Sequence, residues 1–78
     1  MRIEDYKKTK DGLVAVFSDR AKNETEIGKG GYDDCMDAIG TFLKDTGRKS
    51  HYTRLVLLGD SLMIDFGSHS EFVYLRKI

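Results

Sequence analysis

Hydrophobic and polar residues alternate over the last third of the chain, which is the pattern of half-buried β-strands. The pattern predicts strands over Thr53–Leu58, Ser61–Phe66 and Glu71–Arg76. Gly59-Asp60 gives a two-residue link with glycine first, as a type II′ turn prefers, and residues 67–70 give a four-residue link. These links predict the cross-strand pairs Arg54–Asp65, Leu55–Ile64, Leu57–Leu62, Leu62–Leu75, Met63–Tyr74, Ile64–Val73 and Asp65–Phe72.

Successive side chains of a strand point to opposite faces, so this predicted meander has two distinct faces. One face is almost wholly apolar and is predicted to form the core; it carries Leu55, Leu57, Leu62, Ile64, Phe66, Val73 and Leu75. The second face is half apolar, which is unusual for a face left to water; it carries Arg54, Val56, Leu58, Met63, Asp65, Phe72 and Tyr74. A single helix can cover only one of them.

The middle of the chain has the 3.6-residue period of an amphipathic helix. Its apolar positions share one face: Tyr32, Cys35, Met36, Ile39, Phe42 and Leu43. Asp33 and Asp34 suit the N-terminal end, where carboxylates accept from free N–H groups and complement the helix dipole. Gly47 suits the position just after the helix. Gly40, inside it, indicates either close approach of another backbone or a tolerated surface glycine.

The N-terminal third predicts further β-structure. Leu13–Phe17 is a continuous apolar run that follows Asp11-Gly12, a pair that suits a two-residue hairpin turn. Ile3–Thr9 is then predicted as the partner strand, on an edge of the sheet, with Tyr6 facing Phe17. A weaker strand is predicted over Glu24–Gly28.

These elements predict one α+β domain over residues 1–78, with a single amphipathic helix packed on an antiparallel sheet. The expected order is β-β-(β)-α-β-β-β. The sequence leaves open whether the two β regions belong to one sheet.

Composition narrows the functional classes. The chain has 78 residues, and its thirteen basic and thirteen acidic side chains cancel. Zero net charge removes the simplest argument for nucleic acid or an anionic membrane as partner, and is compatible with a homodimer. The apolar runs are too short to span a bilayer. Cys35 is the one cysteine and can form no internal disulfide, so we expect a reducing, cytoplasmic location.

The second face of the meander is the main functional candidate. Its apolar members form a contiguous patch of the kind that marks interfaces: Val56, Leu58, Met63, Phe72 and Tyr74. The alternatives are that the N-terminal hairpin covers this face, or that the register differs. The favoured function is a small non-enzymatic interaction module, adaptor-like or inhibitor-like, with a protein partner that is either a second copy or another chain. In size and lack of motifs the chain is similar to small inhibitors encoded by phages and mobile elements, such as anti-CRISPR proteins.

A second hypothesis is nucleic-acid binding by the basic segment after the helix. Arg48, Lys49, Tyr52 and Arg54 combine phosphate-binding cations with a ring on which a base can stack. The alternative interpretation of this segment is a solvated loop that caps the helix.

A third hypothesis concerns Gly67-Ser68-His69, which precedes the last strand. The string resembles, over about six residues, the catalytic segment of HicA-type toxin ribonucleases. That resemblance implies that His69 acts as a general acid or base; the alternative is a polar turn residue.

The sequence predicts no metal or other cofactor. The cysteine and two histidines lack the usual metal-ligand spacings, and Gly28–Gly31 lacks the Walker spacing. Cys35 lies on the apolar stripe and is expected in the core.

Overall fold

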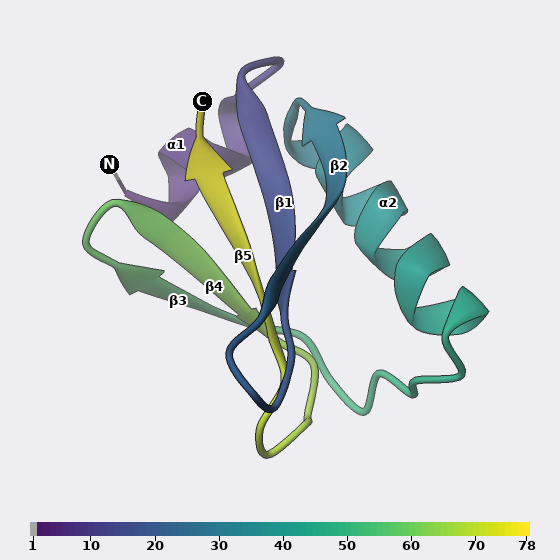
Figure 1. Ribbon diagram of the computed structural model, residues 1–78. Coiled ribbons are helices and arrows are strands. Elements are labelled where there is room, and N and C mark those ends of the chain that lie inside the picture. Colours follow the sequence, from purple (N-terminus) through teal and green to yellow (C-terminus); the bar gives the residue numbers. More distant parts are fainter. Residues whose placement is uncertain (1) are drawn as a thin grey trace.

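The computed structural model describes residues 2–78 and contains two helices and five strands (Figure 1). In chain order they are α1 (Ile3–Lys8), β1 (Leu13–Ser18), β2 (Glu24–Gly30), α2 (Tyr32–Asp45), β3 (Arg54–Leu58), β4 (Ser61–Asp65) and β5 (Phe72–Lys77). This is an α+β fold in which one long helix packs against an antiparallel sheet, as the sequence predicts.

All five strands belong to one sheet, in the order β2-β1-β5-β4-β3. Strand β1 pairs with β2 on one side and with β5 on the other, so the two β regions of the sequence are joined. Helix α2 follows one edge strand, β2, and precedes the other, β3. The chain therefore crosses from one edge of the sheet to the other through α2 and residues 46–53 (Figure 1).

The register of the meander agrees with the sequence prediction in all but one pair. The confirmed pairs are Arg54–Asp65, Leu55–Ile64, Leu57–Leu62, Leu62–Leu75, Met63–Tyr74 and Ile64–Val73. The predicted pair Asp65–Phe72 is wrong, because the β4–β5 ladder ends at Ile64–Val73. The Gly67 N–H donates to the Asp65 carboxylate at 2.9 Å and turns the chain out of the ladder there.

Helix α2 has the predicted apolar face and the predicted ends. The Asp34 carboxylate accepts from the Gly31 N–H at 3.2 Å. At the other end Gly47 has φ of 70°, and the Arg48 N–H donates to the Leu43 carbonyl at 2.8 Å, which closes the helix as a Schellman motif. Gly40 is exposed and an added Cβ would meet nothing within 4 Å, so it is the surface glycine of the two alternatives.

The predicted strand over Ile3–Thr9 is wrong, and so is its Asp11-Gly12 hairpin: this segment forms α1. Acidic residues occupy the first turn and lysines the last, an arrangement that matches the helix dipole. The Asp5 carboxylate accepts from the Arg2 N–H at 2.8 Å and satisfies a free donor at the start of the helix. Tyr6 therefore does not face Phe17 across a ladder.

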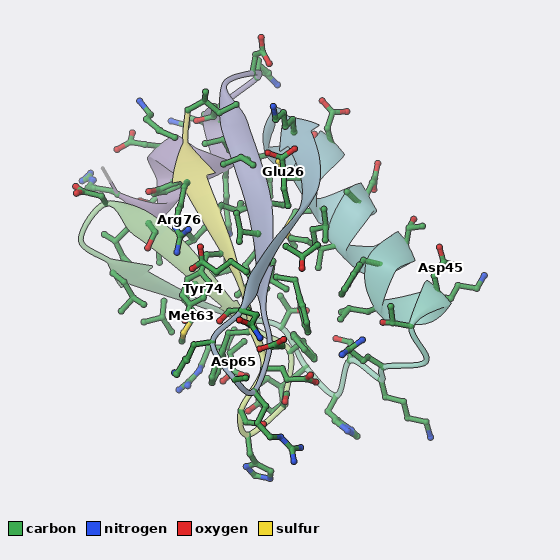
Figure 2. All side chains as sticks on the ribbon, in the orientation of Figure 1. Glu26, Asp45, Met63, Asp65, Tyr74 and Arg76 are labelled. Atoms are coloured by element: carbon green, nitrogen blue, oxygen red, sulfur yellow. The ribbon has the colours of Figure 1, made fainter. Side chains whose placement is uncertain are left out.

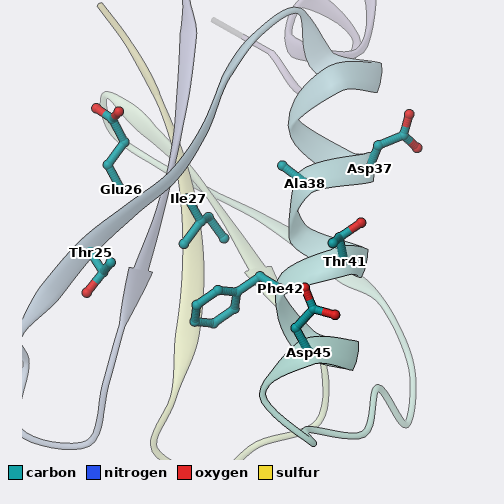
Figure 3. Close-up of a pocket in the computed structure, with 8 residues that line it drawn as sticks. All are labelled: Thr25, Glu26, Ile27, Asp37, Ala38, Thr41, Phe42 and Asp45. Atoms are coloured by element: carbon teal, nitrogen blue, oxygen red, sulfur yellow. The ribbon is translucent and has the colours of Figure 1, made fainter.

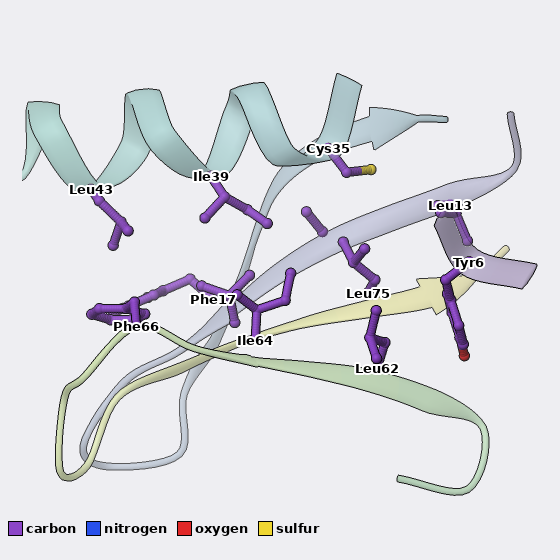
Figure 4. Packing of buried hydrophobic residues seen from close by; sticks show 12 residues of the cluster. Tyr6, Leu13, Phe17, Cys35, Ile39, Leu43, Leu62, Ile64, Phe66 and Leu75 are labelled. Atoms are coloured by element: carbon purple, nitrogen blue, oxygen red, sulfur yellow. The ribbon is translucent and has the colours of Figure 1, made fainter. Parts of the chain in front are cut away.

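The core lies between one face of the sheet and both helices. Figure 4 shows Cys35, Ile39 and Leu43 of α2 pointing toward the strands, with Tyr6 of α1 beside Leu13 at the Cys35 end of the cluster. The buried cluster consists of Tyr6, Leu13, Ala15, Phe17, Cys35, Ile39, Leu43, Leu62, Ile64, Phe66, Val73 and Leu75. Because both helices share this cluster with one face of the sheet, no helix formed by residues 2–78 covers the opposite face, which we call the outer face.

The predicted second face of the meander is part of this outer face. The alternative that an N-terminal hairpin lies over it is wrong, because β1 pairs beside β5 and extends the sheet sideways. The outer face is therefore wider than the meander alone and includes side chains from β1 and β2.

Candidate interaction surfaces

The register aligns outer-face side chains into rows that run across the strands. Met63 pairs with Val56 on one side and with Tyr74 on the other, and Tyr74 pairs with Val16. Opposite residues of an antiparallel pair point to the same face, so these four side chains form one apolar row across β3, β4, β5 and β1. We call it the apolar row.

Charged side chains border the apolar row on the β1–β2 side. Arg76 spans β1 and forms two hydrogen bonds with the Glu24 carboxylate, at 2.9 and 2.8 Å, and its guanidinium carbon lies 5.4 Å from the centre of the Tyr74 ring. Arg76 is paired with Val14 of β1, and Glu24 is paired with Ser18 of β1. Val16 lies between these two positions, so the ion pair passes over its side chain. This explains why Val16 is only 8% exposed on a face without a covering element.

A second ionic group borders the row near β3. Asp65 is 4% exposed, and its carboxylate accepts from the Gly67 N–H at 2.9 Å, the Arg54 guanidinium at 3.1 Å and, more weakly, the Tyr52 hydroxyl at 3.5 Å. The Gly67 hydrogen bond, with support from Arg54, holds the pKa of Asp65 below its usual value. Figure 2 shows Arg76, Tyr74, Met63 and Asp65 together over β4 and β5, away from α2.

Exposure on the predicted interaction surface is uneven. Val56, Met63, Phe72 and Tyr74 are half-buried, whereas Leu58 is 43% exposed. Two other large apolar side chains are also exposed at or just before β3, Leu57 at 38% and Tyr52 at 54%. The sequence did not reveal that Leu57 is exposed, because the alternation of residues along β3 places it on the core face. Leu57 is exposed because β3 lies at the edge of the sheet.

The structure does not hold the basic segment together as one surface. The Arg48 guanidinium forms two hydrogen bonds with Glu71, at 3.1 and 3.0 Å, and lies 4.6 Å from the centre of the Phe17 ring. Tyr52 and Arg54 both turn to the carboxylate of Asp65 on β4. Lys49 is exposed.

The remaining candidates lie apart from one another. His69 is exposed on the link before β5, and Cys35 is fully buried in the core, as expected. Burial, followed by the nearby carboxylate of Asp34, raises the pKa of the Cys35 thiol and keeps it protonated. Within residues 2–78 no three His, Cys, Asp or Glu side chains are arranged to hold a metal ion.

A shallow groove of about 530 Å³ lies between β2 and α2 (Figure 3). Its lining residues are Thr25, Glu26, Ile27, Asp37, Ala38, Thr41, Phe42 and Asp45. Three carboxylates border an apolar floor, which disfavours phosphate or any other anion at this position. Next to it, β2 and α2 approach so closely that a Cβ on Gly28 would lie 2.5 Å from that of Ala38.

Comparison of this chain with protein-family models gives no match, and neither does comparison with curated proteins or with solved structures. In the part of the chain that the structure describes, no helix is both long and apolar enough to cross a membrane.

Proposed function

We propose that this protein is a small, non-enzymatic protein-binding module, of adaptor or inhibitor type, that binds its partner on the outer face. The apolar row carries the proposal. It crosses four strands, no element of residues 2–78 packs over it, and at β3 it meets the exposed side chain of Leu58. Phe72 extends it on β5. An apolar centre with a charged rim is the usual composition of a protein interface.

The rim adds support. Arg76–Glu24 and Arg54–Asp65 are preformed ion pairs, so their side chains are held in place before a partner arrives. Because both signs of charge are present, the surface suits a protein partner better than a polyanion. A cytoplasmic location belongs to the same proposal, since the single thiol is buried and free.

The alternatives have less support. Nucleic-acid binding would need Arg48 and Arg54, and each already donates to a carboxylate. A ribonuclease-like site at His69 would need a second catalytic group, and no hydrogen-bond partner of His69 is present within residues 2–78. Both hypotheses remain predictions for direct assays.

A photo-crosslinking residue at Met63 tests the proposal, with the same residue at Thr41, which is exposed on α2, as the matched control. In cells of the source organism we expect a specific protein adduct from position 63 and none from position 41. The purified adduct partner should then bind the wild-type chain and lose at least about tenfold in affinity to the double variant Met63→Ser, Tyr74→Ala. Equal adducts from both positions, or unchanged affinity in the folded double variant, would contradict the proposal.

A further inference from the structure

The two edges of the sheet are protected to very different degrees. Strand β2 carries charged side chains, packs against α2 and contains a bulge opposite Ala15 and Val16, features that prevent another strand from adding to an edge. Strand β3 is regular over all five residues and contains no lysine, proline or bulge. Within residues 2–78 no backbone hydrogen bond joins β3 to a segment other than β4.

The open edge of β3 has a defined pattern of donors and acceptors. A two-residue link makes the flanking residues, Leu58 and Ser61, a hydrogen-bonded pair, and hydrogen-bonded and non-hydrogen-bonded pairs then alternate along the strands. Leu58, Val56 and Arg54 therefore use their backbone groups toward β4. Leu55 and Leu57 turn theirs to the open edge.

We infer that two copies of this chain pair antiparallel through β3, with the two-fold axis at Val56, so that two five-stranded sheets become one continuous sheet. This inference deepens the proposed function, on which it rests, by naming a second copy as one partner of the module.

The Val56-centred register satisfies the edge completely. Leu55 of each copy faces Leu57 of the other, and both present outward N–H and C=O groups, so each such pair exchanges two hydrogen bonds. The side chains of these four leucines then cover one another on the core side. This removes from water the 38% exposed Leu57, which the fold alone leaves uncovered.

Charge favours this antiparallel pairing of the two β3 strands over a parallel pairing. In the antiparallel arrangement Arg54 faces Leu58 of the second copy, and no two like charges meet. An in-register parallel arrangement would place Arg54 directly beside its own copy, which is destabilising. The antiparallel pairing also brings the exposed side chain of Leu58 against the aliphatic part of Arg54.

The pairing has a consequence for the outer face. Val56 is the end of the apolar row, and it would face Val56 of the second copy across the axis. The two rows would then join into one apolar row across both sheets. The dimer would thus offer a protein partner a surface of double length, with its centre at the axis.

Cysteine crosslinking tests the register. Val56→Cys places two thiols in a non-hydrogen-bonded pair, with Cα atoms about 4.5 Å apart, which a disulfide can bridge. Leu58→Cys is the matched control on the same face of β3. Position 58 is more exposed than position 56. In this register, however, the Cα atoms of residue 58 in the two copies would lie about 14 Å apart, because they are four residues apart along the strands. The native Cys35 is fully buried and does not compete.

We expect Val56→Cys to form an intermolecular disulfide at least about tenfold faster than Leu58→Cys in a glutathione buffer. Sedimentation of the wild type should show a mass that approaches two chains as concentration rises. Leu57→Lys should weaken this association at least about tenfold, whereas Thr25→Lys, the same charge change on β2, should leave it unchanged. Circular dichroism reports whether each variant is folded.

A wild type that stays monomeric at every concentration would overturn the inference, and so would equal crosslinking of the two cysteine variants. Failure of the dimer is distinguishable from failure of the proposed function. If the partner captured at position 63 still binds the Leu57→Lys variant, the outer face functions without β3 pairing. If Met63→Ser with Tyr74→Ala abolishes partner binding but leaves Val56→Cys crosslinking intact, both proposals stand.

Discussion

Gly40 shows how a single residue can be sub-optimal without serving a contact. It lies on the exposed side of α2, and a Cβ there would meet nothing within 4 Å. Gly40→Ala should therefore raise the free energy of unfolding by about 0.5–1 kcal/mol, because alanine loses less backbone entropy on folding. Urea denaturation measures the change. Gly47→Ala is the control and should destabilise, since Gly47 has φ of 70°. A loss of stability in Gly40→Ala would contradict the open space found around this position.

Other residues show what the sequence can and cannot predict at this scale. The burial of Cys35 follows from its position on a long periodic stripe, and the pairing of Arg54 with Asp65 follows from the length of one turn. Glu24 and Arg76 lie 52 positions apart, and nothing in the sequence indicates that they form an ion pair. That contact depends on β1 lying between β2 and β5, which is a property of the sheet order.

At the scale of elements, length separates the successful predictions from the failure. The 14 residues of α2 contain several turns of its period, and the meander is fixed by short turns. The six residues of α1 contain only Ile3 and Tyr6 as apolar positions, and this spacing is too short to identify a period. Asp11-Gly12 suits a hairpin and so favours a preceding strand, but in the structure α1 ends at its C-cap Thr9, and Gly12, at φ of 86°, lies in the link between α1 and β1.

Helix α1 should contribute to stability mainly through Tyr6. The side chain is 1% exposed, and its hydroxyl donates to the Asp60 carbonyl at 3.1 Å, which ties α1 to the β3–β4 turn. Tyr6→Phe should lower the free energy of unfolding by about 1 kcal/mol, and Tyr6→Ala by about 3–5 kcal/mol. Thermal and urea unfolding followed by circular dichroism test both values. Equal effects of the two variants would show that the ring is not packed in the core.

Arg48 should stabilise the segment between α2 and β3, as Tyr6 stabilises α1. Its guanidinium pairs with Glu71 through two hydrogen bonds and stacks on Phe17, and both charged side chains are less than one-third exposed. Arg48→Ala should lower the free energy of unfolding by about 2 kcal/mol. Arg48→Lys should recover less than half of this loss, because an ammonium group can neither form the paired hydrogen bonds nor stack on the ring. Full recovery by lysine in urea denaturation would show that charge alone is sufficient.

At the scale of the whole molecule, the sheet order decides what the surface can do. The sequence predicts two apolar faces and one long helix, but it does not indicate where β1 pairs. Because β1 pairs beside β5, α1 and α2 share one face, and the other face extends across five strands without a covering helix in residues 2–78. The same order leaves β3 at an edge, which is why its apolar residues Leu57 and Leu58 are exposed.

Three ion pairs connect separate parts of this molecule, so the stability of the whole fold should depend on pH. Hydrogen bonds from Arg76, Gly67 and Arg48 respectively hold the pKa values of Glu24, Asp65 and Glu71 below their usual values. A carboxyl group whose pKa is lower in the folded state stabilises the fold above its unfolded pKa of about 4 and loses that contribution as pH falls through the folded value. The free energy of unfolding should therefore be level near neutral pH and fall steadily below about pH 4.

Urea denaturation across this range tests the prediction, and one matched pair of variants assigns it. Glu71→Gln should lower stability at neutral pH and flatten the decline in acid, because the Glu71 side chain is only 22% exposed. Glu24→Gln removes the same charge from a pair whose two side chains are 45% and 39% exposed, where water and salt screen the interaction. It should change the acid decline less. If the two variants flatten the acid decline equally, burial does not determine which ion pair stabilises the fold, and the larger contribution expected from the Arg48–Glu71 pair would be contradicted.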